Sequence, residues 1–133
     1  MAKDTKNDYT IKMHDNLGEI VIADEVIAVI AGLAAMEVDG VASMAGNATR
    51  DLISKIGIKS LSKGVKVDVL EDVVSVDVAL NLKYGYKVKE VSRKVQEKAK
   101  TAIENMTGLN VADVNVRIAG IEVKQEKKQE KNK

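Results

Sequence analysis

The side chains that most often carry catalysis are scarce in this chain. Cysteine is absent and His14 is the only histidine, so neither a Ser-His-Asp triad nor a histidine or thiolate metal site can be assembled. Acidic pairs are the remaining candidates for acid–base work, but Asp24-Glu25 suits a helix start and Glu71-Asp72 suits a hairpin turn. We therefore expect no catalytic residue, no metal, no cofactor and no small-molecule substrate.

Glycine-rich phosphate-binding loops are also missing from the sequence. Gly32, Gly40 and Gly46 match neither the Walker spacing nor the dinucleotide-binding spacing. A KH-type RNA-binding domain is disfavoured, because the chain contains no G-x-x-G loop and neither Phe nor Trp to stack on bases. The sequence therefore favours a protein that acts by binding partners, and we do not expect an enzyme.

Positive charge gathers in one internal segment, which is a candidate for contact with an anionic partner. A helical conformation would bring three of its lysines near one face, and only Asp51 opposes the four basic residues Arg50, Lys55, Lys59 and Lys63. Such a stretch can contact anionic lipid, RNA or an acidic protein surface. A solvated surface face is the simpler alternative, so we expect any lipid or RNA binding to be weak and salt-sensitive.

A second candidate partner-binding site is the run Tyr84-Gly85-Tyr86, which Lys87 and Lys89 follow at the start of a predicted helix. Lysines are unfavourable at the positive end of a helix dipole, and an acidic partner or a bound anion would explain them. The alternative is a rim of core tyrosines beside a slightly frustrated helix start.

The distribution of charge argues against a dedicated nucleic-acid binder. The whole chain of 133 residues carries +1, its last ten residues, KQEKKQEKNK, contribute +3, and the first 123 residues therefore carry about −2. We expect a mobile N-terminal tail at residues 1–16, one domain at 17–123 and a lysine-rich tail at 124–133. The lack of cysteine, of a secretory signal and of a membrane-spanning segment fits a cytoplasmic location.

Hydrophobic periodicity predicts the elements that would position these residues. The first half should hold a strand at Gly18–Ile22, a helix at 25–38 that Asp24 caps and Gly40 terminates, and a connector at 49–62. Alternating valines predict a hairpin of strands at 65–69 and 74–82, and a last strand covers 114–118 with a bulge at Gly120.

The helix predicted at 87–106 carries a single apolar stripe, formed by Val88, Val91, Val95, Ala99, Ala102 and Met106. The resulting order is β-α-connector-β-β-α-β. It predicts an α+β fold, with a mainly antiparallel sheet and two helices packed on one face.

The first predicted helix is a candidate interface, because Val26 to Met36 contains no polar side chain. We expect its bulky side to meet the sheet through Val26, Val29, Ile30, Leu33 and Met36. Its small side would then dock a partner or a second copy through Ala28, Ala31, Gly32 and Ala35. The alternative is that the connector or the second helix of the same chain covers the small side.

Several segments, in this order and spacing, resemble the alkaline-shock (Gls-type) family: Gly18-Glu19-Ile20, Val26-Ile27, Ala34, Glu37-Val38-Asp39-Gly40-Val41, Gly64-Val65-Lys66-Val67, Tyr84-Gly85, Val114-Asn115-Val116, Ile118 and Gly120-Ile121. The resemblance implies a cytoplasmic protein of Gram-positive bacteria with a role in envelope or alkaline stress and no catalytic residues. It also implies, for some members, attachment to the membrane by a separate anchor protein.

One stretch supports a finer resemblance. Residues 46–49 through 63–67 are similar to a branch of the family associated with acetyl-CoA carboxylase and fatty-acid synthesis. The partners implied are proteins, either a membrane anchor or the lipid-synthesis machinery. An RNA- or ribosome-associated module is the alternative that the basic connector and tail leave open.

Overall fold

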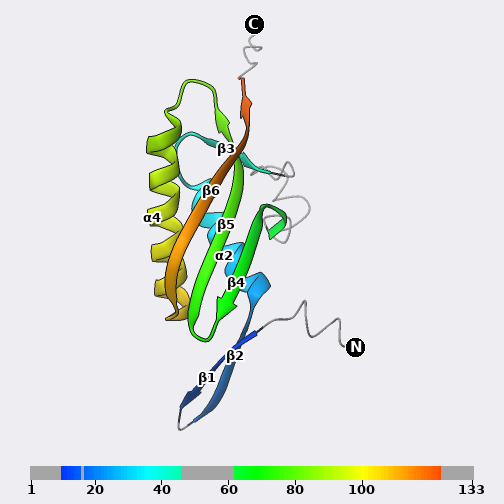
Figure 1. Ribbon diagram of the computed structural model, residues 1–133, viewed down its shortest axis with the longest axis vertical. Coiled ribbons are helices and arrows are strands. Elements are labelled where there is room, and N and C mark those ends of the chain that lie inside the picture. Colours follow the sequence, from blue (N-terminus) through cyan, green and yellow to red (C-terminus); the bar gives the residue numbers. More distant parts are fainter. Residues whose placement is uncertain (1–9, 16, 46–61, 124–133) are drawn as a thin grey trace, which may run out of the picture.

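The computed structural model describes residues 10–15, 17–45 and 62–123, which form an α+β fold (Figure 1). Its elements in chain order are β1 (Thr10–Asp15), β2 (Gly18–Ala23), α2 (Asp24–Met36), β3 (Val41–Met44), β4 (Val65–Leu70), β5 (Val73–Lys83), α4 (Val88–Thr107) and β6 (Asn110–Glu122). The predicted fold class is confirmed. The predicted connector at 49–62 and the tail at 124–133 lie almost wholly outside the described residues.

The main sheet is organised around β5, which pairs with every other strand in it. β6 runs parallel to β5 along its whole length, while β4 pairs antiparallel with residues 73–78 and β3 antiparallel with residues 80–82. Because β6 occupies one edge of β5, β3 and β4 must share the other edge end to end. The sheet is mainly antiparallel, as predicted, and the parallel pair arises because α4 carries the chain back between β5 and β6.

Rows of β-branched side chains form the sheet side of the core. Register places Val69 beside Val74 and Val111, with parallel rows through Val67, Val76 and Val114 and through Val65, Val78 and Val116. Stiff branched side chains pack well on a pleated surface, and those of β5 are fully buried on this face. The intervening residues of β5, Ser75, Asp77, Ala79 and Asn81, point to the opposite face, which α2 and α4 do not cover.

The helix α4 buries a line of residues spaced four apart: Val91, Val95, Ala99 and Ile103. The predicted stripe was right at its centre and wrong at its ends, since Val88 and Met106 are exposed and Ile103 is buried. Residues spaced four apart form a row that is inclined to the helix axis. Because the sheet contacts this row, Met106, which lies off it, stays exposed. Gly108 closes the helix with φ +79°, and its N–H donates to the Glu104 carbonyl at 2.9 Å.

Two loops that are distant in sequence pack together at one end of the fold. Gly40 follows α2 with φ +101°, a conformation that side chains with a Cβ resist. A Cβ atom there would lie 2.7 Å from Tyr86 Cδ2 and 2.8 Å from Val91 Cγ2. The Lys83 N–H also donates to the Gly40 carbonyl at 2.8 Å, so a backbone hydrogen bond joins the turn before β3 to the end of β5.

Three local features differ from the sequence-based expectation. Thr10–Asp15, placed in the N-terminal tail, forms β1, which pairs antiparallel with β2 in a separate hairpin that extends from the domain (Figure 1). The four-residue strand β3 was not predicted, because so short a run between loops has no measurable period. Ala23 is the N-cap of α2 and makes no side-chain cap bond, so Asp24 lies in the first turn, where a carboxylate complements the dipole.

Candidate functional site

The orientation of α2 differs from the one expected from its sequence, although Ile30 and Met36 of the predicted inward side are buried as expected. Ala28, Ala31, Gly32 and Ala35 are buried, whereas Val26 is 47% exposed and Leu33 is 40% exposed. The small residues lie inside because α2 must approach the sheet and α4 at the same time, and short side chains permit the closest approach of a helix backbone. An interface through the small side is therefore wrong in this fold, and the same chain covers that side.

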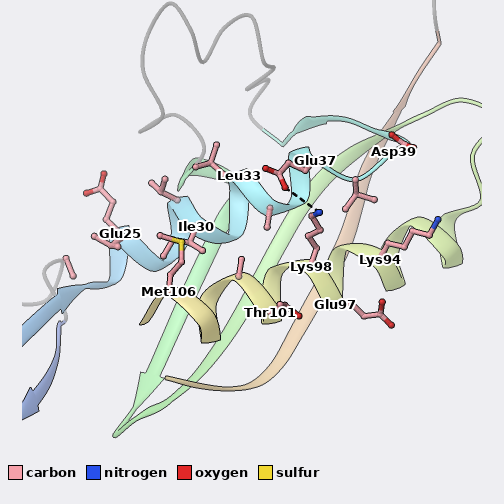
Figure 2. A pocket seen from close by; sticks show the side chains of 16 residues that line it. Glu25, Ile30, Leu33, Glu37, Asp39, Lys94, Glu97, Lys98, Thr101 and Met106 are labelled. Atoms are coloured by element: carbon pink, nitrogen blue, oxygen red, sulfur yellow. Dashed lines mark ion pairs between the residues drawn. The ribbon is translucent and has the colours of Figure 1, made fainter. Parts of the chain in front are cut away.

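The outward residues of α2 form one wall of a groove, and α4 forms the other (Figure 2). The groove has a volume of about 1240 Å³. Its apolar lining comes mainly from Val26, Val29, Ile30 and Leu33 of α2 and from Ala102 and Met106 of α4. Met106 is 71% exposed, so this surface offers apolar side chains that the described residues leave uncovered.

The groove has a charged end and a mainly apolar end. Lys98 Nζ lies 3.5 Å from Glu37 Oε1, and this ion pair links the two helices across the groove (Figure 2). Asp39, Lys94 and Glu97 line the same end, while Glu25 lies at the other end. Exposed ion pairs contribute at most about 1 kcal/mol, so the Glu37–Lys98 pair does not hold the groove shut.

The basic residues predicted to act together cannot be placed as a group. Arg50, Lys55 and Lys59 lie outside the described residues. Lys63 is exposed and lines a hollow of about 480 Å³ on the sheet face that α2 and α4 do not cover, together with Lys66, Asp77 and Arg117. Lys63, Lys66 and Arg117 thus place three basic side chains around this smaller hollow.

The tyrosine segment lies apart from the groove. Tyr84 is exposed, Tyr86 is partly exposed where it packs over Gly40, and Lys87 is the N-cap of α4 without a side-chain cap bond. Glu90 occupies the first turn of α4 and supplies an acid at its positive end. The structure thus gives Tyr86 a packing role, and partner binding by Tyr84, Tyr86 and Lys87 stays a prediction.

Polar side chains of α4 bind the backbone of β6. Gln96 Nε2 donates to the Val114 carbonyl at 3.0 Å, Lys100 Nζ donates to the Val111 carbonyl at 3.1 Å, and Glu104 Oε2 accepts from the Val111 N–H at 3.0 Å. The hydrogen bond from Val111 and the nearby Lys100 ammonium lower the pKa of the Glu104 carboxyl, although desolvation opposes them. These groups fix a helix to an edge strand and leave no side chain poised for reaction.

One serine lies beside a carboxylate, an arrangement that could suggest a nucleophile. Ser43 Oγ donates to Glu122 Oε2 at 2.8 Å and accepts from Asn81 Nδ2 at 2.9 Å. Ser43 is completely buried and no substrate could reach it. The three side chains therefore tie β3, β5 and β6 together across the sheet.

Metal binding and membrane crossing find no support in the described part of the chain. Within residues 10–15, 17–45 and 62–123, no group of three or more His, Asp or Glu side chains could hold a metal ion. None of the helices in these same ranges combines the length and the apolarity that crossing a membrane requires.

Val26 and Leu33 were predicted to meet the sheet and instead line the groove as exposed residues, whereas Ile30 is buried as predicted. The signal that could have corrected this is the spacing of Val26, Val29 and Leu33, which marks an outward row once the alanines are assigned to close packing. Met106 was predicted to be buried because it ends the apolar stripe of α4, but it is exposed and lines the groove.

Comparison with known proteins identifies a family and relatives that this chain resembles. The model of the alkaline shock protein 23 family, described as having a "cell envelope-related function", matches residues 12–123. The chain is 41% identical over 120 residues to "Uncharacterized protein YqhY" of Bacillus subtilis, covering 88% of this chain and 89% of that protein. It is also 30% identical over 130 residues to "Stress response regulator gls24 homolog" of Streptococcus pyogenes, covering 97% of this chain and 71% of that protein.

Among solved structures, a variant of "MamM CTD" aligns with a TM-score of 0.47 and 13% identity over 74% of this chain and 96% of that one. The chain belongs to the alkaline-shock (Gls24-type) family of envelope-related stress proteins of Gram-positive bacteria.

Proposed function

We propose that this protein serves the envelope stress response as a non-enzymatic binding protein that docks a protein partner in the groove between α2 and α4. The groove itself carries the proposal: Val26, Leu33 and Met106 expose apolar surface along one continuous hollow. Contiguous exposed apolar surface on a soluble domain marks interaction sites more often than chance would give. Membership of an envelope-related family supports a partner that is associated with the cell envelope.

We further propose that the partner belongs to envelope-associated or fatty-acid synthesis machinery, with acetyl-CoA carboxylase or a membrane anchor as specific candidates. The support is the resemblance of residues 46–49 and 63–67 to the family branch linked to that enzyme. Docking on such a partner would bring the protein to the membrane from the cytoplasm.

The test compares two leucine-to-glutamate variants in cells that lack their own copy of the protein. Leu33→Glu places a charge in the groove, whereas Leu70→Glu changes a leucine that is 74% exposed at the β4–β5 turn, outside the groove. We expect Leu33→Glu to lose both co-sedimentation with the envelope fraction and tolerance of alkaline medium, and Leu70→Glu to keep both. Equal behaviour of the two folded variants would show that the groove is not the working surface.

RNA binding is the second candidate function, because Lys63, Lys66 and Arg117 line the hollow on the open sheet face. Asp77 lies among them and the folded part is acidic overall, so we expect weak binding that added salt removes. Purification from lysate with and without nuclease distinguishes the candidates. Partners that disappear with nuclease, together with tight RNA binding above physiological salt, would favour RNA over the groove.

A further inference from the structure

The chemistry of the groove walls restricts what can occupy it. Its lining contains four carboxylates and two ammonium groups, a net charge of −2 at neutral pH. The acids are spread around the rim: Glu25 lies at one end, Glu37 and Asp39 at the other, and Glu97 on the outer turn of α4. Since the carboxylates outnumber the ammonium groups of Lys94 and Lys98, an occupant that carries basic residues on its flanks would meet a rim of net opposite charge.

The shape of the groove favours a helix. Its walls are two neighbouring helices, and an apolar floor runs between them (Figure 2). The 13 residues of α2 span about 20 Å, which matches an occupying helix of three to four turns. A third helix laid along such a floor presents apolar residues at i, i+3, i+4 and i+7, the recognition mode of helix-in-groove complexes.

Other occupants meet the rim unfavourably. A second copy of the chain turned face to face would bring two rims of charge −2 together, and like charges facing each other across an interface are costly. An anionic lipid surface would face the same four carboxylates. The charge of the groove thus selects against both.

We infer that the groove between α2 and α4 accepts a basic amphipathic helix of a partner protein. This inference rests on the proposed function and adds to it the conformation and the charge of the docking segment. The apolar face of the partner helix packs on Val26, Leu33 and Met106, and its flanking lysines or arginines lie near Asp39 and Glu97.

Synthetic peptides of about 14 residues provide the probe. One carries leucines at helical i, i+3, i+4 and i+7 spacing with lysines on both flanks, the second replaces these lysines by glutamates, and the third keeps the lysines but contains a central proline. Fluorescence anisotropy of labelled peptides gives Kd, and circular dichroism of the mixture reports helix formation. We expect the lysine peptide to bind at least about tenfold more tightly than either control at low salt and to gain helicity on binding.

Protein variants assign the binding to the groove. Leu33→Glu should abolish binding, and the double variant Asp39→Asn/Glu97→Gln should reduce the preference for lysine over glutamate peptide. The matched control, Asp68→Asn/Asp113→Asn, removes two exposed carboxylates outside the groove and should leave that preference unchanged.

Several results would overturn the inference. Equal affinity for the lysine and glutamate peptides would show that the occupant need not be basic. Tight binding of the proline peptide would show that the occupant need not be helical. A doubling of mass that Leu33→Glu abolishes would assign the groove to a second copy. If no peptide binds while the envelope phenotype of Leu33→Glu persists, the assigned occupant is wrong and the proposed function stands.

Discussion

Replacing Gly40 by alanine tests whether the two loops at one end of the fold depend on the absence of a side chain. The residue has φ +101°, and an added Cβ would lie within 3 Å of both Tyr86 and Val91. Tyr86 is partly exposed and can rotate away, but Val91 is buried in the line of α4 residues that faces the sheet. The substitution therefore strains the backbone and also pushes α4 away from the α2–β3 turn.

The expected magnitude is the sum of these two effects. A left-handed conformation costs a residue with a Cβ about 1–2 kcal/mol. Displacing a packed core side chain costs about 1–3 kcal/mol. We therefore expect Gly40→Ala to lower the free energy of unfolding by about 2–5 kcal/mol, a large share of the stability of a small domain.

The chain offers a matched control in Gly85, which has nearly the same φ, +99°. Among the described residues beyond its two chain neighbours, none has an atom within 4 Å of the position that an added Cβ would occupy. Gly85→Ala should therefore lower the free energy of unfolding only by the cost of the backbone conformation, about 1–2 kcal/mol. Urea unfolding followed by circular dichroism gives both values, and an unchanged m-value shows that the unfolded state is comparable. The difference between the variants isolates the contact with Tyr86 and Val91.

A double variant tests the identity of the contact. Tyr86→Ala in the Gly40→Ala background should cost less than the two single losses combined, by at least about 0.5 kcal/mol, because it removes one clashing partner. Equal losses for Gly40→Ala and Gly85→Ala, or strict additivity with Tyr86→Ala, would refute the reasoning and show that the loops accommodate a side chain freely.

Three further predictions follow from the core, the α4–β6 contact and the residue inventory. Leu80→Ala, at a fully buried position of β5, should lower the free energy of unfolding by about 2–5 kcal/mol, whereas Leu70→Ala, at an exposed one, should change it by less than about 0.5 kcal/mol in the same urea assay. The folded-state pKa of Glu104 is lowered, so its stabilisation is complete above the unfolded-state pKa and is lost as pH falls through the lower folded value. The urea midpoints of wild type and Glu104→Gln should therefore converge in acid, and a gap that is constant with pH would contradict this assignment. Untagged protein should retain no stoichiometric zinc or iron after dialysis, and metal analysis that finds either would overturn the expectation.

Strong periodicity made the second half of the fold predictable. The alternating valines of β4 and β5 and the spaced apolar residues of α4 each report one buried face, so strand, helix and core could be assigned from the sequence. The bulge near Gly120 was also predicted, and the register shifts there because Ile118 and Gly120 pair with consecutive residues of β5.

The candidate site was less predictable because it depends on how elements approach one another. Nearly every position of α2 is apolar, so periodicity alone cannot say which side faces inward. The side that faces inward is decided by how closely α2 approaches the sheet. The small residues Ala31 and Ala35 allow a close approach, but no local sequence pattern reveals that distance. β1 was missed for a related reason: its pairing with β2 is visible only once both strands are placed.

The hydrogen bonds from α4 to β6 have a consequence for the behaviour of the protein at high concentration. Among the described strands, β6 has β5 as its only partner, so its other edge could pair with a strand of another molecule. Gln96, Lys100 and Glu104 occupy backbone groups of Val111 and Val114 with helix side chains, which cannot propagate a sheet. At high protein concentration, these contacts keep the first part of the β6 edge from pairing with a strand of another molecule, and loosening α4 would expose it.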